Sequence, residues 1–221
     1  YGIDLPDESC RILIIDSMPY FNSLSDRYEK KCRPNSEIIN KKIAQKIEQG
    51  LGRGVRGEKD YCAILIIGSD LVKFMRSVTS KKYFSVQTQK QIDIGLEIAE
   101  MASEEQKPTE CAFDSVKSLI NQMLNRDDGW KEYYNGEMES IEQKENSSTI
   151  YDQLLEESEI EKKYILEEYE NAAIDMQAFI NKYAKDPLEK GWYLQKLARY
   201  YYPIRKEKSV KIQKSAFKTN P

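Results

Sequence analysis

The chain has 221 residues, with 34 lysines and arginines against 37 aspartates and glutamates, which gives a formal net charge of −3. It contains no histidine, which excludes imidazole metal sites, Ser-His-Asp triads and Cys-His dyads within this chain. No apolar run approaches the roughly 20 residues that a membrane-spanning helix needs. We therefore expect a cytoplasmic globular protein of one or two domains that has no membrane partner.

Two short, continuously apolar runs, at residues 11–16 and 62–68, predict β-strands. Runs of this kind are typical of strands buried on both faces of a parallel sheet. The stretch between them predicts a long helix, which Asn35 or Ser36 can cap. Its apolar residues recur every four positions, at Ile39, Ile43, Ile47 and Leu51. Strand, helical crossover and strand together form a βαβ unit, which is normally right-handed.

Helical patterns continue through the rest of the chain. A short helix is predicted over residues 69–76 and a longer one over 87–101, before a polar linker at 104–109 where we place a domain boundary. Beyond the linker, apolar residues with helical spacing recur over 113–124 and 165–183. The second stretch keeps heptad spacing for under three repeats, which indicates packing within a domain rather than a free coiled coil.

The last predicted helix has a clear start. Asp186 can cap it, Pro187 takes its first position, and Glu189 stands where a capping-box acid belongs. The helix should end near Tyr202, because Pro203 disfavours helical geometry in the residue before it.

The predicted fold class is α/β. Two strands alone do not make a stable sheet, and a parallel pair leaves unpaired edges. We therefore expect further strands ahead of Tyr1 in the natural protein, so that this chain is a C-terminal fragment. A partial parallel-sheet domain is expected over residues 1–103, followed by a mostly α-helical domain over residues 110–221.

The most informative stretch lies at the end of the first long helix, where Arg53 and Arg56 stand three residues apart. Two guanidinium groups at this spacing can converge on one polyanion, such as a transferring phosphoryl group. Gly54 between them leaves room for a close approach. Taken without its context, the pair is better explained as two solvated arginines at a helix end.

The context resembles a known family. A QxxGRxxR pattern is formed by Gln49, Gly52, Arg53 and Arg56. This pattern resembles motif VI of superfamily 2 helicases, and Gly2 and Asp4 match the G-x-D turn of motif V. The Pro-Tyr pair at 19–20 and the Asp-Tyr pair at 60–61 resemble the XPD/DinG-like branch in particular. The resemblance is specific over about residues 1–76.

The resemblance implies that residues 1–103 are the second RecA-like domain of an ATP-dependent DNA helicase, a P-loop NTPase. By position, Arg56 would be the arginine finger on the γ-phosphate and Arg53 its partner in charge neutralisation. The implied nucleotide-binding residues are Gly2, Asp4, Gln49 and Gly52. The implied partners are single-stranded DNA, with RNA as the open alternative, and an N-terminal RecA-like domain of the same protein.

One departure from the helicase pattern limits what this chain can do alone. It has no GxxxxGK[ST] loop and no acidic magnesium-binding motif ahead of the arginines. ATP and Mg²⁺ would therefore be bound mainly by the N-terminal domain, and the isolated chain is predicted to be inactive as an ATPase. The alternative is a non-catalytic, helicase-like scaffold whose helical domain docks a partner protein.

Charge is unevenly distributed near the C-terminus. Residues 137–170 hold twelve acidic and three basic residues, whereas residues 190–218 hold nine basic and one acidic residue. The basic stretch is interleaved with aromatic residues, and this combination suits phosphates and stacked bases. The predicted nucleic-acid-binding residues are Tyr20, Lys196, Arg199 and Arg205. The open alternative is that the aromatic residues form a core and the lysines solvate it.

We predict no metal site in this chain. Its four cysteines lie far apart and form no CxxC pair, which is unlike the clustered ligands of zinc and iron–sulfur sites. Cys62 falls within a predicted strand, which indicates a buried structural thiol. A site that uses all four cysteines is the disfavoured alternative.

Overall fold

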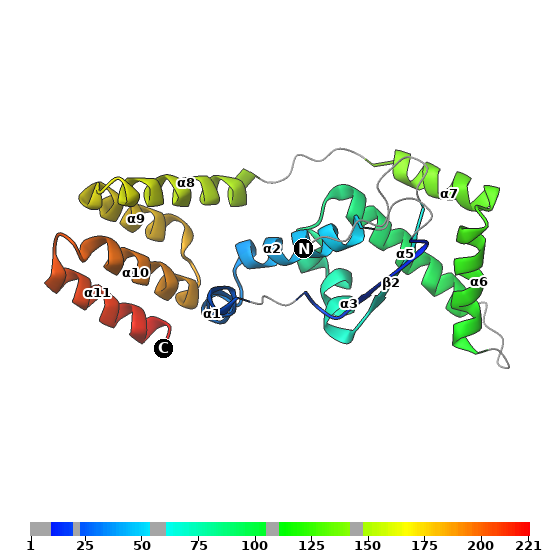
Figure 1. Cartoon of the computed structure of the whole chain (residues 1–221), viewed down its shortest axis with the longest axis horizontal. Helices are drawn as coiled ribbons and strands as arrows, with labels where there is room; N and C mark the ends of the chain where they lie inside the picture. Colours follow the sequence, from blue (N-terminus) through cyan, green and yellow to red (C-terminus); the bar gives the residue numbers. More distant parts are fainter. Residues whose placement is uncertain (1–9, 20–22, 54–60, 105–110, 142–147) are drawn as a thin grey trace. The chain divides into compact units, whose positions relative to one another are not determined.

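The computed structural model describes residues 10–19, 23–53, 61–104, 111–141 and 148–221 (Figure 1). The chain divides into two compact units. The first unit takes residues 1–20 and 41–144, and the second takes residues 21–40 and 145–221. These units differ from the two domains predicted from the sequence, residues 1–103 and 110–221. The predicted domain boundaries stay a prediction. No helix of the described part is long and apolar enough to cross a membrane.

The first unit holds a parallel pair of strands, as predicted. Strand β1 (Ile12–Asp16) pairs with β2 (Ala63–Ile67), and the register places Ile12 opposite Ala63 and Asp16 opposite Ile67. Helix α2 (Glu37–Leu51) lies on the connection between them. Its predicted apolar face is buried at Ile39, Ile43 and Ile47. The fold class is therefore α/β, with a partial parallel sheet in a mostly helical chain.

One expectation about the sheet is wrong. Strand β1 is not buried on both faces, because its residues alternate between exposed and half-buried positions. Ile12 is 46% exposed and Ile14 is 56% exposed. Among the described residues the sheet has only two strands, and Ile15 on the opposite face of β1 approaches α2. An apolar run thus identified the strand, but it did not show which of its faces would be covered.

Five further helices complete the described part of the first unit. They are α3 (Ser69–Arg76), α4 (Val78–Lys81), α5 (Val86–Glu104), α6 (Ala112–Leu124) and α7 (Asp128–Glu139). Leu71, Phe84 and Ile94 are buried here, at 3% exposure or less. The predicted helices at 69–76 and 87–101 are confirmed by α3 and α5, and the helical pattern at 113–124 is confirmed by α6.

The second unit is entirely helical in its described part. It contains α1 (Leu24–Cys32), α8 (Ser148–Ile165), α9 (Tyr169–Tyr183), α10 (Pro187–Tyr201) and α11 (Lys206–Thr219). Figure 1 shows α8 beside α9, and α10 between α9 and α11. Met176 and Phe179 of α9 are fully buried in its core. This confirms packing within a domain for the part of the predicted stretch that forms α9, whereas Ile165 ends α8 and is 70% exposed.

The start of α10 is confirmed at Asp186 and Pro187, whereas the Glu189 carboxylate, expected in a capping box, accepts hydrogen bonds from Arg33 and Ser36. The Asp186 side chain accepts hydrogen bonds from the backbone N–H groups of Leu188, at 2.9 Å, and Glu189, at 3.1 Å. Pro187 opens the helix, which ends at Tyr201. It is not the last helix, however, because α11 follows it closely. Pro203 correctly indicated the end of α10, but a proline after one helix does not prevent a new helix from starting a few residues later.

Helix α1 joins this unit although it lies between the two strands in sequence. Arg33, just after α1, forms ion pairs with Glu29 and with Glu189 of α10, and it donates a hydrogen bond to the Tyr193 hydroxyl at 2.7 Å. The Asn220 amide donates to the backbone carbonyl of Cys32 at 2.8 Å. The segment between the strands is therefore a structural part of the C-terminal helical unit.

Candidate functional site

The predicted motif VI residues begin at the C-terminal end of α2. Leu51 is the last helical residue, and the backbone N–H of Gly52 still donates to the Glu48 carbonyl at 2.9 Å. The Arg53 N–H donates to the Gly50 carbonyl at 3.1 Å, which closes the turn. Gln49 is exposed and Arg53 is half-buried. The helix therefore presents both polar side chains at its end, where the chain leaves regular structure.

The same end of α2 lies against strand β1. A Cβ atom added to Gly50 would be 3.4 Å from Cδ1 of Ile15, which is ordinary contact distance. The Glu48 carboxylate accepts a hydrogen bond from the backbone N–H of Ser85 at 2.7 Å. Nearer the start of α2, the Lys41 ammonium group donates a hydrogen bond to the Tyr83 carbonyl at 2.7 Å. These contacts fix the motif-bearing helix to the sheet and to the segment before α5.

Glu48 is a positioning residue that the sequence did not indicate. Its partner is a backbone N–H group 37 positions further along the chain, and such a partner leaves no signature in side-chain patterns.

The structure describes only part of the predicted site. Gln49, Gly52 and Arg53 are described: Gln49 lies on the last turn of α2, and Gly52 and Arg53 form the turn that follows it. The predicted residues Gly2, Asp4, Tyr20 and Arg56 lie outside the described residues. Their assignments to the nucleotide and nucleic-acid sites stay predictions.

The carboxyl ends of the two strands meet in a tight backbone arrangement. Ser17 follows β1 with a φ of 71°, and its N–H donates to the Ile67 carbonyl at 3.0 Å. Gly68 follows β2 with a φ of 97°, and a Cβ atom there would lie 3.1 Å from the Ser17 backbone. Glycine is thus required at this edge, which is the side of parallel sheets where ligands usually bind.

Two cysteine thiols of the first unit lie near the start of the sheet, whereas Cys111 is exposed just before α6. Cys10 and Cys62 have their Sγ atoms 3.9 Å apart. Burial, together with the Cys10 neighbour, raises the pKa of the Cys62 thiol to about 11. Cys62 is only half-buried, less than predicted. Within the described ranges, no three Cys, Asp or Glu side chains are grouped as a metal site would need.

Three of the nine basic residues in the C-terminal stretch pair with acids of the stretch before it. Lys196 pairs with Glu157 and Arg199 with Glu161, both acids of α8. Arg205 pairs with Glu170 of α9 at 2.7 Å. The uneven charge of the sequence is therefore partly compensated inside the second unit.

These ion pairs bear on the predicted nucleic-acid site. Lys196, Arg199 and Arg205, the described residues of that predicted site, already have carboxylate partners. A phosphate would have to compete with each carboxylate. Two aromatic residues of the basic stretch, Tyr193 and Tyr200, are fully buried. They serve as core, as the open alternative expected, and cannot stack on bases in this conformation. Nucleic-acid binding by the three cations stays a prediction.

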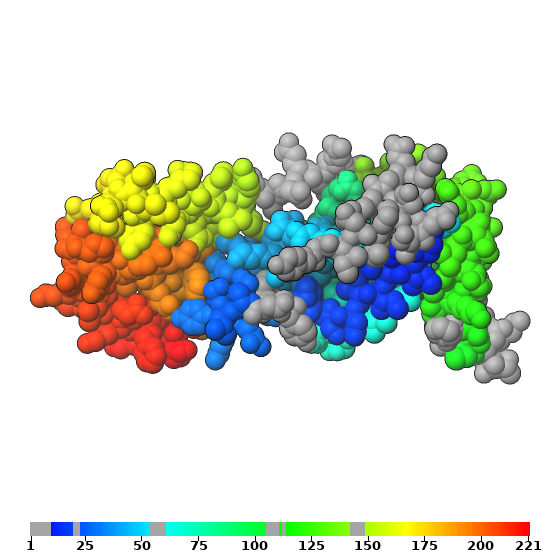
Figure 2. Space-filling view, in the orientation of Figure 1, coloured from blue at the N-terminus to red at the C-terminus, as the bar shows by residue number. Residues whose placement is uncertain are grey.

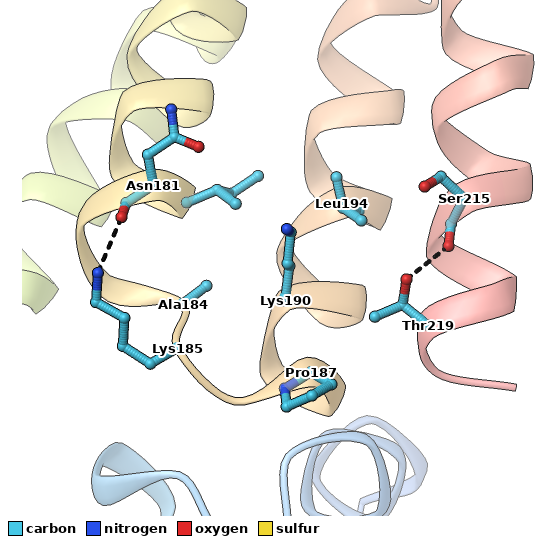
Figure 3. Close-up of a pocket in the computed structure, with 9 residues that line it drawn as sticks. Asn181, Ala184, Lys185, Pro187, Lys190, Leu194, Ser215 and Thr219 are labelled. Atoms are coloured by element: carbon cyan, nitrogen blue, oxygen red, sulfur yellow. Dashed lines mark hydrogen bonds between the residues drawn. The ribbon is translucent and has the colours of Figure 1, made fainter.

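A groove of about 550 Å³ opens between α9, α10 and α11 (Figure 3). Its apolar lining is Ile180, Ala184, Pro187 and Leu194. Its polar lining is Asn181, Lys185, Lys190, Ser215 and Thr219, and none of the described residues that line it is acidic. The lysine at 190 extends into the space between α9 and α10 in Figure 3. The groove therefore offers positive charge above an apolar floor.

Comparison with known proteins gives one match. Residues 1–90 match the family model of the helicase C-terminal domain. No curated protein and no solved structure matches the chain. The matched residues include both strands, α2 and the motif residues at its end, and they stop within α5. Residues 1–90 are therefore similar to a helicase C-terminal domain.

Proposed function

We propose that this chain is the C-terminal part of an XPD/DinG-like, ATP-dependent nucleic-acid helicase. The observation that carries the proposal is the match of residues 1–90 to the helicase C-terminal domain, with Gln49, Gly52 and Arg53 at the end of a helix between two parallel strands. A RecA-like half of this kind works with a second half across a nucleotide cleft. The reaction is ATP hydrolysis coupled to movement along a single strand.

In this proposal the chain contributes arginines to the cleft. Arg56 is the finger that reaches the γ-phosphate, and Arg53 shares the neutralisation of the charge that develops there. A guanidinium group suits this task because it is always charged and presents several donors in a fixed plane. The finger reaches the phosphate only when the two halves close, so that hydrolysis is coupled to domain motion.

The nucleotide itself is held mainly by the other half. ATP and Mg²⁺ would bind to its phosphate loop and acidic motif, where the metal ion neutralises charge on the phosphates. Gly2, Asp4, Gln49 and Gly52 would complete the cleft from this side. The isolated chain is therefore inactive as an ATPase, and hydrolysis by the purified 221-residue chain would contradict this division of labour.

The test uses the full-length protein with Arg56→Ala. Nucleic-acid-stimulated ATP turnover should fall by about 10³-fold or more, because an arginine finger contributes about 10³–10⁵ in rate. Binding of single-stranded DNA should be largely retained. Arg76→Ala, at an exposed arginine of α3, is the matched control and should keep normal turnover. Normal turnover in Arg56→Ala would exclude the finger assignment.

A further inference from the structure

Helix α11 carries a stripe of lysines on its outer face. Lys211, Lys214 and Lys218 are spaced by three and four residues, which places them on one side of a helix. Ser209 and Ala216 are buried on the opposite side, so that the stripe faces solvent. Figure 2 shows α11, in red, along the edge of the second unit. All three lysines are exposed.

Unlike Lys196 and Arg199 of α10, these lysines have no carboxylate partner among the described residues. Among the ion pairs of the described residues, none involves the three lysines of the stripe or Lys190. The α11 helix itself carries a single acid, Glu207, against five lysines. The positive charge that α8 and α9 leave uncompensated is thus concentrated here.

The groove and the lysine stripe are neighbours on α11. Ser215, which lines the groove, lies four positions after Lys211 and three before Lys218, so that all three share one side of the helix. Across the groove stand Lys185 and Lys190 (Figure 3). Cations therefore flank the groove on both sides, and the described part of its lining contains no acid.

An aromatic side chain lies next to this charge. Phe217 is 68% exposed, and it follows Lys214 by three positions, which makes the two neighbours on the helix surface. An exposed aromatic ring beside lysines is the arrangement that single-stranded nucleic acids use, with bases on the ring and phosphates on the cations. We define the α11 surface as Lys185, Lys190, Lys211, Lys214, Phe217 and Lys218.

We propose that the α11 surface binds the backbone of single-stranded nucleic acid. The site lies outside residues 1–90, which match the helicase family, and it is distinct from the paired cations predicted from the sequence. The choice of nucleic acid as partner rests on the proposed function. The exposed apolar residues of α11 are only Val210 and Phe217, too few for stable insertion into a membrane.

The test measures binding of a fluorescent 20-nucleotide thymidine strand to the 221-residue chain by anisotropy, without ATP. If all five lysines contact phosphates, the slope of log affinity against log salt is about −3.5, from about 0.7 per contact on single strands. In the triple variant Lys211→Gln, Lys214→Gln, Lys218→Gln the slope should become less steep, at about −1.4. Binding at low salt should weaken by about tenfold or more.

A second triple variant controls for net charge. Lys162→Gln, Lys163→Gln, Lys182→Gln removes the same charge from α8 and α9, at exposed lysines that already have carboxylate partners. It should bind within about twofold of the parent chain. Equal losses in both variants, or unchanged binding in the α11 variant, would overturn the proposal. So would tighter binding to polyglutamate or to vesicles with anionic lipid than to the strand.

This binding assay is independent of the nucleotide cleft. It contains no ATP and does not involve Arg56, so that it can succeed while the finger assignment fails. Conversely, full-length protein with the triple α11 variant can retain ATP turnover at saturating strand concentrations while the site is lost. A failure of the α11 surface proposal can therefore be distinguished from a failure of the proposed helicase function.

Discussion

Arg33 is the residue that ties the strand-connecting segment to the C-terminal helices. It is 2% exposed, and it meets Glu29, Glu189 and the Tyr193 hydroxyl. Burial disfavours the charged guanidinium, but the negative partners outweigh it, and the pKa of Arg33 is raised. A buried charge of this kind is tolerated only because it is paired on several sides. Its Nε atom has no hydrogen-bond partner within the described residues.

Gly191 marks the closest approach between α10 and the end of α11. A Cβ atom there would lie 2.4 Å from Cβ of Asn220 and 3.3 Å from the Ala216 carbonyl oxygen. Gly191→Ala should therefore destabilise the second unit by about 1–3 kcal/mol, the usual cost of overpacking. Urea unfolding followed by circular dichroism measures the change.

Gly95 provides the comparison for this variant. It lies within α5, and a Cβ atom there would meet nothing within 4 Å. Gly95→Ala should stabilise the chain by about 0.5–1 kcal/mol, because alanine loses less backbone freedom on folding. If both alanines had the same effect, the close packing at residue 191 would be refuted.

At the scale of elements, α8 and α10 are joined by a charged cluster. Glu161 of α8 accepts hydrogen bonds from the Tyr200 hydroxyl and from Arg199 of α10. Partial burial works to raise the pKa of Glu161, but these donors outweigh it and lower the pKa below its ordinary value. Because the folded state holds the proton less tightly, the cluster stabilises the fold above the unfolded pKa and loses this effect as pH falls through the folded pKa.

The predicted outcome concerns Glu161→Gln. At pH 7 the variant should be less stable than the parent chain by about 1 kcal/mol, since it loses a charge-assisted interaction that is partly screened by solvent. The difference should shrink as the pH falls from about 6 to below 4. Unfolding free energies measured across this range test the prediction.

Glu159→Gln is the matched control, because Glu159 pairs with the exposed Lys162 of the same helix, α8. It should differ little from the parent chain at any pH. A Glu161→Gln difference that stays constant with pH would show that the carboxylate charge is not the source of the stability.

Local signals in the sequence predicted several elements well. The cap at Asp186 with Pro187 gave the start of α10, and the four-residue apolar repeat gave α2. Helix α11 was missed because its inward positions include Ser209 and Ala216, which do not form a strong apolar pattern. Burial of small residues depends on a close neighbouring helix, which local patterns do not reveal.

At the scale of the whole molecule, the sequence predicted a partial sheet and a helical region, but it did not predict which segments of the chain belong to each. Contacts such as Arg33 with Glu189 join residues 156 positions apart, and no local pattern records such a pairing. The segment with α1 consequently belongs with the C-terminal helices rather than with the strands that flank it. The uneven charge suggested a nucleic-acid surface, whereas part of it serves to pair α8 and α9 with the basic stretch.

The candidate site was predictable as a motif and less so as a surface. The family match agrees with the expected helicase C-terminal domain, while the roles of Gln49, Gly52 and Arg53 at the end of α2 stay predictions. The support that Glu48 receives from the Ser85 backbone emerged only from the fold. Motifs record the residues that perform the chemistry, while positioning residues are set by tertiary contacts.

The most direct test of the central claim is steady-state ATP turnover by the full-length protein with Arg56→Lys, at saturating single-stranded DNA. Lysine keeps the positive charge but lacks the planar, multi-donor guanidinium group. If Arg56 is the finger, kcat should fall by about 100-fold or more while the affinity for DNA stays close to that of the parent protein. A kcat within about twofold of the parent value would contradict the assignment of this chain as the arginine-supplying half of a helicase.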